Sequence, residues 1–338
     1  MSLDLKEIQS YKRWFLNHLV KQKFWVMAVL AGITIVTLLR VLIPAVLGMA
    51  AYERILDILD TEPNVKQNLA PQDVDQLEGE IIFENVDFSY MENEAVFKGF
   101  NLRIEKGEKL AIVGHTGAGK SSLVKLLARY YEFQGGSIKI DGNNIRDMNL
   151  TSYRRNLGIV QQDVFLFSGT LEENIRYGRQ DASEEDLWNA IRAVHADEFI
   201  DYLQEGLQFQ VGERGGGLSA GQKQLVSFAR ALLADPRILI LDEATSSVDA
   251  YTEAIIQEAL EVLLSGRTSI IIAHRLSTIL KADRIILMEN GQIIEEGTHR
   301  SLLASGGKYG QLYKQYYEHQ SIDWEPIKVR EGKTFSLP

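Results

Sequence analysis

Residues 114–122, read Gly-His-Thr-Gly-Ala-Gly-Lys-Ser-Ser, constrain the fold of this chain more than any other stretch. They fit the pattern G-x-x-x-x-G-K-[ST], in which the backbone N–H groups of a glycine-rich loop surround a phosphate. Apolar residues at 109–113 predict a buried strand before the loop, and apolar residues at helical intervals over 123–131 predict a helix after it. This order directs backbone N–H groups and the positive end of the helix to one point. The stretch therefore predicts a phosphate-binding loop in an α/β fold.

We expect the loop to bind phosphate through both its backbone N–H groups and its side chains. Gly117 and Gly119 can adopt backbone angles that side chains forbid, so the loop can wrap closely around a phosphate. Lys120 is expected to reach the β- and γ-phosphates, and the Ser121 hydroxyl is expected to hold Mg²⁺. The alternative is a glycine-rich turn that matches by chance, which the flanking strand and helix disfavour. The candidate nucleotide-binding residues here are Gly114, His115, Thr116, Gly117, Ala118, Gly119, Lys120, Ser121 and Ser122.

Composition excludes several other kinds of site. The chain has 338 residues, of which 45% are apolar and 24% charged, as expected for a globular protein of about two domains. A net charge of −10 without a long Lys/Arg stripe argues against a nucleic-acid partner. The chain has no cysteine, which excludes disulfides and thiolate metal sites, and no H-x-x-x-H pair points to zinc.

The N-terminal region predicts a membrane-spanning helix. Residues 1–23 are polar and net basic, and the following residues to 52 carry a single charge, at Arg40. Residues 24–39 alone would reach about 24 Å as a helix, against a hydrocarbon core of about 30 Å, but the stretch beyond Pro44 supplies further length. Burying Arg40 would cost about 2.5–3.5 kcal/mol, so we expect it to reach the interface or to face protein. The alternative is a buried core helix.

A single crossing would conflict with the phosphate-binding loop. The basic flank favours a cytoplasmic N-terminus. One span would then place the loop outside the cell, away from ATP and Mg²⁺, whereas an even number of spans would not. Either the segment does not cross the membrane, or further spans are missing from this chain.

Two further apolar runs predict buried strands that end in polar side chains. Residues 238–241 are followed by Asp242 and Glu243, and residues 269–272 lead to His274. Ligands of parallel sheets bind at the carboxyl ends of the strands. We therefore expect Asp242 to hold Mg²⁺ through water, Glu243 to polarise an attacking water, and His274 to contact the γ-phosphate. A solvated strand end and a structural histidine are the alternatives.

Two weaker signals gain meaning only beside the loop. Tyr90 ends a predicted strand at 80–88 and could stack on adenine, although strand-end packing alone would explain it. Residues 219–222 precede a helical run at 223–233, where small residues expose backbone N–H groups as an anion site. The residues of this second signal are Ser219, Ala220, Gly221 and Gln222.

In this combination and order, the motifs of residues 79–319 resemble the nucleotide-binding domain of ATP-binding cassette (ABC) transporters, most closely of the exporter branch. By this resemblance Tyr90 is the adenine-stacking aromatic, and 114–122 is the Walker A loop. Gln162 matches the Q-loop glutamine, which contacts Mg²⁺ and couples to the membrane domain. Residues 211–215 look like the exporter coupling loop.

The resemblance also assigns the later motifs. Residues 218–222 match the LSGGQ signature, with Ala220 in place of its first glycine. Residues 238–243 look like Walker B followed by the catalytic glutamate, 246–249 look like the D-loop ending in Asp249, and His274 matches the switch histidine. The implied catalytic residues are Glu243, His274 and Gln162, and the implied metal ligands are Ser121, Gln162 and Asp242.

The resemblance implies a fold, a domain order and two cofactors. The fold is that of an α/β P-loop NTPase (ABC ATPase), with a mostly parallel sheet core, an antiparallel β subdomain, a helical subdomain and one N-terminal hydrophobic helix. We expect an amphipathic segment with a transmembrane-like helix at 1–52, a linker with a short helix at 53–78, the nucleotide-binding domain at 79–319 and a tail without an assigned role at 320–338. The cofactors are ATP and Mg²⁺.

The implied function is that of an ATP-hydrolysing exporter subunit in the cell membrane, with its ATPase domain in the cytoplasm. Two such domains, in a homo- or heterodimer, close around two ATP molecules and drive export of a hydrophobic substrate through a transmembrane domain in the lipid bilayer. The family has six transmembrane helices, and about five are missing between Gly48 and Ala50. The alternative is a truncated module that binds ATP and dimerises but does not transport.

Overall fold

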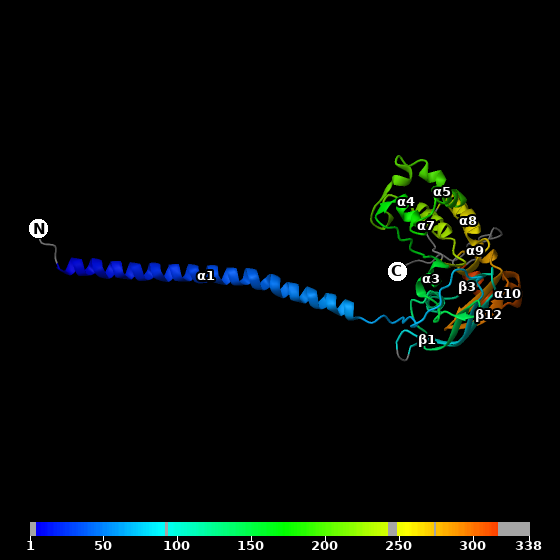
Figure 1. Ribbon diagram of the computed structural model, residues 1–338, viewed down its shortest axis with the longest axis horizontal. Coiled ribbons are helices and arrows are strands. Elements are labelled where there is room, and N and C mark those ends of the chain that lie inside the picture. The colour runs from blue at the N-terminus through cyan, green and yellow to red at the C-terminus, as the bar shows by residue number, and fades with distance from the viewer. Residues whose placement is uncertain (1–4, 92–93, 243–248, 274, 317–338) are drawn as a thin grey trace, which may run out of the picture. The chain divides into compact units, whose positions relative to one another are not determined.

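The computed structural model describes residues 5–91, 94–242, 249–273 and 275–316. The expected roles of Glu243 and His274, the D-loop residues before Asp249 and the tail at 320–338 fall outside these described residues. The chain divides into two compact units, Met1–Pro63 and Asn64–Pro338, which we describe separately (Figure 1).

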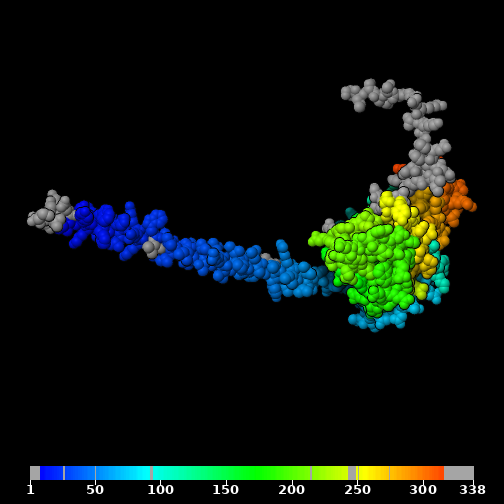
Figure 2. All heavy atoms as spheres, turned by 90° about the horizontal axis from the view of Figure 1, so that it is seen from above, coloured from blue at the N-terminus to red at the C-terminus, as the bar shows by residue number. Residues whose placement is uncertain are grey.

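The first unit consists of helix α1 (Leu5–Asp60), which runs without interruption past Pro44. The short helix expected after residue 52 forms the last turns of α1. Among the described residues, α1 is the only helix long and apolar enough to cross a membrane. The hydroxyls of Thr34 and Thr37 each donate a 2.8 Å hydrogen bond to the backbone carbonyl four residues earlier. Figure 2 shows the side chains of α1 standing out along the helix.

The second unit is built on a six-stranded sheet of order β12-β11-β3-β10-β9-β6. All neighbouring pairs are parallel except β11 and β12. The expected strands at 109–113 and 238–241 are confirmed, and the second extends by one residue to Asp242. The strands are β3 (Lys109–Val113), β6 (Leu157–Val160), β9 (Ile238–Asp242), β10 (Thr268–Ile272), β11 (Arg284–Glu289) and β12 (Gln292–Gly297).

The apolar runs of the central strands are buried on both faces of this sheet. Along β9, Ile238 and Ile240 belong to one hydrophobic core, whereas Leu239 and Leu241 belong to another. The first core also contains α2 (Lys120–Leu127) and an antiparallel sheet of order β2-β1-β4-β5. Its strands are β1 (Ile81–Ser89), β2 (Ala95–Ile104), β4 (Gly135–Ile140) and β5 (Asn143–Asn144).

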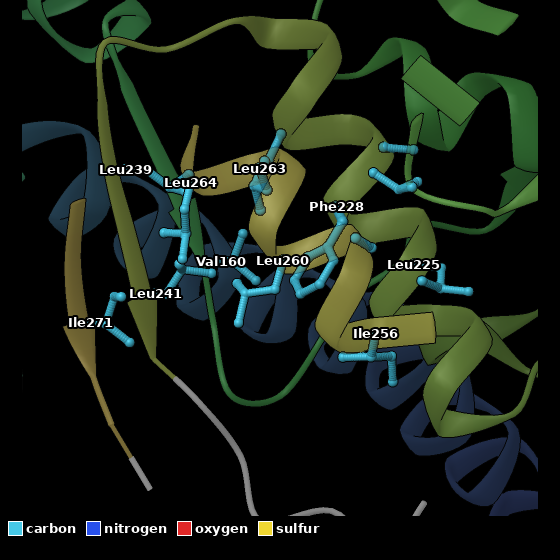
Figure 3. Close-up of a cluster of buried hydrophobic side chains, with 14 of the residues drawn as sticks. Val160, Leu225, Phe228, Leu239, Leu241, Ile256, Leu260, Leu263, Leu264 and Ile271 are labelled. Atoms are coloured by element: carbon cyan, nitrogen blue, oxygen red, sulfur yellow. The ribbon is translucent and has the colours of Figure 1, made fainter. Parts of the chain in front are cut away.

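The second core packs the opposite face of the large sheet against a helical region. Figure 3 shows its centre, where apolar side chains of α7 and α8 meet those of the strands. The green atoms of this region cover the near face of the second unit in Figure 2. The helices here are α4 (Leu171–Arg176), α5 (Glu184–Ala193), α6 (Asp197–Ile200), α7 (Ala220–Ala234) and α8 (Ala250–Leu264).

The remaining elements are short. They are α3 (Leu150–Arg155), β7 (Gly169–Thr170), β8 (Gln210–Val211), α9 (Leu276–Leu280), α10 (His299–Ser305), α11 (Lys308–Tyr316) and the 3-10 turns Gly206–Gln208 and Glu213–Gly215.

The helix after the phosphate-binding loop is shorter than its sequence pattern predicts. The apolar spacing continues to Tyr131, but α2 ends at Leu127. Arg129 adopts a left-handed backbone with φ 50°, and its buried guanidinium donates to the carbonyls of Ile145 and Lys66. These tertiary hydrogen bonds hold the chain in a turn that local helical spacing cannot reveal.

Candidate functional site

The glycine-rich loop connects β3 to α2 and leaves open space around its middle glycine. Gly114, Gly117 and Gly119 all have positive φ, at 147°, 84° and 103°. A Cβ at Gly114 would lie 2.3 Å from the Met288 carbonyl oxygen, so a side chain cannot fit there. A Cβ at Gly117 would meet no atom within 4 Å. The loop is thus closely packed where it leaves the sheet and open where a phosphate can approach.

Lys120 begins α2 with its side chain folded back along the loop. It is only 8% exposed, and its Nζ donates to the carbonyls of Gly114 at 2.6 Å and His115 at 3.0 Å. Burial lowers the pKa of Lys120, and the charge of Asp242 opposes this effect. The ammonium is therefore held beside the loop by weak acceptors that an anionic oxygen can replace.

The two serines after Lys120 have different surroundings. Ser121 is exposed, so that its hydroxyl can reach a ligand. Ser122 is buried, and its hydroxyl lies 3.0 Å from the hydroxyl of Tyr90. Only the first hydroxyl suits a metal ligand, as the sequence pattern predicts.

Tyr90 belongs to an aromatic surface beside α2. Its ring is 41% exposed and lies edge-on to Tyr131, with centroids 5.0 Å apart. The ammonium of Lys125 lies 5.5 Å from the Tyr90 centroid and 5.8 Å from that of Tyr131. The sequence predicted a role for Tyr90 but not its contacts with the other two residues, because the pattern assigned Tyr131 to the helix and gave Lys125 no role.

Asp242 lies at the carboxyl end of β9, where the sequence predicted a metal ligand. In the register of the sheet it is level with Ile272 of β10, which is level with Ile112 of β3. The end of β9 and the start of the loop therefore lie at the same edge of the sheet, separated by one strand.

Gln162 approaches this edge from β6. Gln162, Asp242 and Ala220 line one cavity of about 360 Å³ between the sheet and the helical region. An exposed serine hydroxyl, a carboxylate and an amide oxygen are the hard oxygen ligands that Mg²⁺ prefers. The open loop and this donor set together fit a magnesium-bound nucleoside triphosphate.

The signature residues form the cap of α7. The Ser219 hydroxyl accepts from the backbone N–H of Gln222 at 3.2 Å, and the Gln222 Oε1 accepts from the backbone N–H of Ser219 at 2.8 Å. Gly221 is buried, whereas Ala220 is the exposed first residue of the helix. Because alanine is favourable in a helix, Ala220 can replace glycine without strain.

Asp249 caps α8 in the same manner. Its Oδ1 accepts from the backbone N–H of Thr252 at 3.0 Å, and this bond lowers the pKa of the Asp249 carboxyl. Asp249 is exposed, so its second oxygen is open to a partner.

Comparisons with known proteins agree with the fold and the site. The family profile described as ABC transporter matches residues 97–246. The uncharacterized ABC transporter ATP-binding protein YknV of Bacillus subtilis is 54% identical over 271 residues, which cover 80% of this chain and 45% of that protein. A Staphylococcus aureus protein provisionally named as a multidrug export ATP-binding/permease protein is 48% identical over 260 residues, or 77% of this chain and 45% of that protein.

A solved structure extends the similarity to three dimensions. The structure of a bacterial Atm1-family ABC exporter with ATP bound superposes with a TM-score of 0.74 and 38% identity, covering 82% of this chain and 48% of that chain. This chain spans about half the length of the curated relatives it matches. The expected ABC ATPase fold is confirmed. The chain therefore carries the ATP-binding domain of an ABC transporter.

Proposed function

We propose that this chain is the ATP-hydrolysing subunit of an ABC exporter, in which ATP-driven pairing of two nucleotide-binding domains moves a hydrophobic substrate across the membrane. The observation that carries the proposal is the convergence at one edge of the sheet. There the open glycine loop and the buried ammonium of Lys120 lie at the carboxyl end of β3, and the carboxylate of Asp242 lies at the carboxyl end of β9, with only β10 between these two strands.

Nucleotide binding would use groups that are already in place. Lys120 exchanges its two carbonyl acceptors for β- and γ-phosphate oxygens, which are stronger acceptors because they are charged. Tyr90 stacks on adenine, with Tyr131 and Lys125 supporting its ring. Ser121, Asp242 and Gln162 would hold Mg²⁺, which neutralises charge on the phosphates.

Hydrolysis requires a group that orients and activates water. Glu243 directly follows Asp242 in sequence, and His274 follows the neighbouring strand β10. We assign Glu243 to accept a hydrogen bond from the attacking water, His274 to contact the γ-phosphate, and Gln162 to sense the bound nucleotide.

A second nucleotide-binding domain would complete each site. Ser219 and Ala220 are exposed and Gln222 is partly exposed at the positive N-terminal end of α7, a helix of 15 residues. An anion approaching from a second domain would meet this end, opposite Lys120. Asp249 is exposed at the start of α8 and would contact the second domain.

Two parts of this chain are candidates for contact with the membrane or with a transmembrane domain. Helix α1 is long and apolar enough to anchor it. Downstream of Gln162, the rings of Phe165, Phe167 and Tyr177 are exposed and pack on one another. We assign this aromatic patch as the surface on which the transmembrane domain docks, because exposed clusters of large apolar side chains mark interfaces.

The substitution Glu243→Gln tests the proposal. It removes the negative charge that activates water but keeps the size of the side chain. We expect ATP binding to persist while turnover falls by at least about a hundredfold. A fluorescent ATP analogue and release of inorganic phosphate measure the two effects. Glu185→Gln, on the exposed face of α5, is the matched control. Unchanged turnover in Glu243→Gln would refute the assignment.

Reconstitution separates the exporter from the alternative of a module that binds ATP and dimerises without transport. ATP-dependent movement of a hydrophobic dye by this chain alone in vesicles would exclude the module. Movement only after a separate transmembrane domain is added would identify the chain as a subunit that works with a partner.

A further inference from the structure

Two ion pairs join α8 to the segment around α9, one at each end. Glu253 in the first turn of α8 pairs with Arg275, directly before α9. Glu261 in the last turns of α8 pairs with Lys281, directly after α9. The first pair is the more buried, because the Arg275 side chain is 12% exposed and that of Lys281 is 35% exposed. Ion pairs shielded from water hold their geometry more firmly than exposed ones.

The buried pair lies where two parts of the proposed site meet. Arg275 follows His274 in the sequence. The backbone N–H of Glu253 donates to the carbonyl of Asp249 at 2.9 Å, so the carboxylate is one helical turn from the D-loop aspartate. The Gln257 side chain also donates to the Glu253 carboxylate at 3.0 Å and restricts its position.

The body of α8 provides a rigid support for this pair. Ile256, Leu260, Leu263 and Leu264 on α8 are all buried in the core that packs against β9 and β10 (Figure 3). Close-packed interiors resist displacement. A group bonded to the first turn of α8 is thereby fixed relative to the sheet whose strand ends carry the site.

We propose that the Glu253–Arg275 ion pair positions the segment that carries His274, and so sets the rate of ATP hydrolysis without contributing to ATP binding. The inference rests on the proposed ATPase function. Arg275 suits the role because its planar guanidinium binds a carboxylate in a fixed orientation. Small displacements of reacting groups lower the rate of the chemical step far more than they weaken binding.

A charge exchange in the full chain tests this. Glu253→Arg and Arg275→Glu each place like charges opposite one another, and the double variant restores the pair in reverse. We expect each single substitution to lower kcat by about tenfold or more while KM and the affinity for a fluorescent ATP analogue stay unchanged. We expect the double variant to recover most of kcat, and Arg275→Lys, which keeps the charge, to lose less than Arg275→Glu.

The second ion pair supplies the matched control. Glu261→Lys and Lys281→Glu break the other link between the same two segments, and we expect kcat to stay at the wild-type value. The inference would be overturned by folded single variants with unchanged kcat, by no recovery in the double variant, or by equal losses at both pairs.

Glu243→Gln separates failure of this inference from failure of the proposed function. If Glu243→Gln is inactive but the charge exchange has no effect, only the inference is wrong. If Glu243→Gln hydrolyses ATP as fast as the wild-type chain, the proposed function and the inference both fail. Should a single charge reversal prevent folding, Glu253→Gln and Arg275→Gln, which remove the charge without reversing it, replace the reversals, and we expect each to lower kcat while KM stays unchanged.

Discussion

Among single residues, Lys120 shows most directly how burial and function are linked. Its ammonium is held beside the loop by two carbonyl oxygens, and desolvation lowers its pKa. The charged form is the one that binds phosphate. A bound triphosphate would favour the charged form and raise the pKa again, so binding takes up a proton wherever free Lys120 has lost one.

This linkage predicts the pH dependence of ATP binding. ATP affinity should fall as pH rises through the lowered pKa of Lys120, and the fall should begin below the ordinary lysine value of about 10.4. Lys120→Ala should weaken binding at least about tenfold at neutral pH, because a charged hydrogen-bonding group is lost. Lys120→Ala should also remove the fall in ATP affinity at alkaline pH. Lys314→Ala, at an exposed position of α11, should change neither the ATP affinity nor its pH dependence. Titration calorimetry across the alkaline range measures both, and an unchanged pH profile in Lys120→Ala would contradict the account.

Sequence alone predicted the strands beside the candidate residues where one local pattern contained them. The loop directly follows β3, Asp242 is the last residue of β9, and Tyr90 directly follows β1. Lys125 approaches Tyr90 from α2 itself, whereas Tyr131 approaches it from the turn after α2, where the buried guanidinium of Arg129 is hydrogen-bonded. Contacts that depend on tertiary hydrogen bonds produce no periodic pattern of apolar residues from which they could be predicted.

At the scale of elements, Ser219 at the start of α7 combines a structural role as the helix cap with a proposed role in binding phosphate. The Ser219 hydroxyl caps the helix through the N–H of Gln222, and we propose that it also meets a phosphate of a second domain's ATP. The sequence predicted an anion site here from small residues. It did not predict the reciprocal bond of Gln222, whose side chain accepts from the backbone N–H of Ser219 and completes the capping box.

Substitutions at Ser219 can separate the two roles. Ser219→Ala should lower the free energy of unfolding by about 1 kcal/mol through loss of the cap, and should also lower turnover. Ser219→Asp keeps an excellent cap but places a negative charge near the phosphate, so turnover should fall while stability is retained. Thr298→Ala removes a similar capping box from α10, away from the site, and should lower stability only. Urea unfolding and phosphate release measure the two effects. Full turnover in Ser219→Asp would exclude the phosphate contact.

The buried strands were the elements easiest to predict. The alternation along β9 sends successive side chains into two different cores, so a continuous apolar run is required, and its length gives the strand length. The end of α1 was harder to predict. The charged residues after Tyr52 suggested a separate helix, but their backbone continues α1 to Asp60. A change in polarity along a helix does not require a break in its backbone.

At the scale of the whole molecule, the two units differ in how far their apolar side chains are buried. Both hydrophobic cores belong to the unit Asn64–Pro338. The first residues of that unit are hydrogen-bonded to the rest of it. Gln72 forms a parallel bridge with Met148, and Asn68 donates to the Asp147 carboxylate at 2.7 Å. In contrast, the apolar window of α1 is not buried in the protein at all. Apolar surface of this extent is stable in lipid and not in water.

We therefore expect α1 to govern membrane association and to leave nucleotide binding unaffected. The full chain should float with phosphatidylcholine vesicles in a density gradient, whereas residues 64–338 should remain in the aqueous fraction and bind a fluorescent ATP analogue with the same affinity. In the full chain, Leu30→Asp with Leu38→Asp should abolish flotation, because each carboxylate would add about 2.5–3.5 kcal/mol to insertion. Replacing Leu69, which is fully exposed in the second unit, with Asp is the control and should not change flotation. Flotation of residues 64–338, or of the doubly substituted chain, would show that a surface other than α1 binds lipid. Loss of ATP binding in residues 64–338 would show that the second unit depends on α1 for its fold.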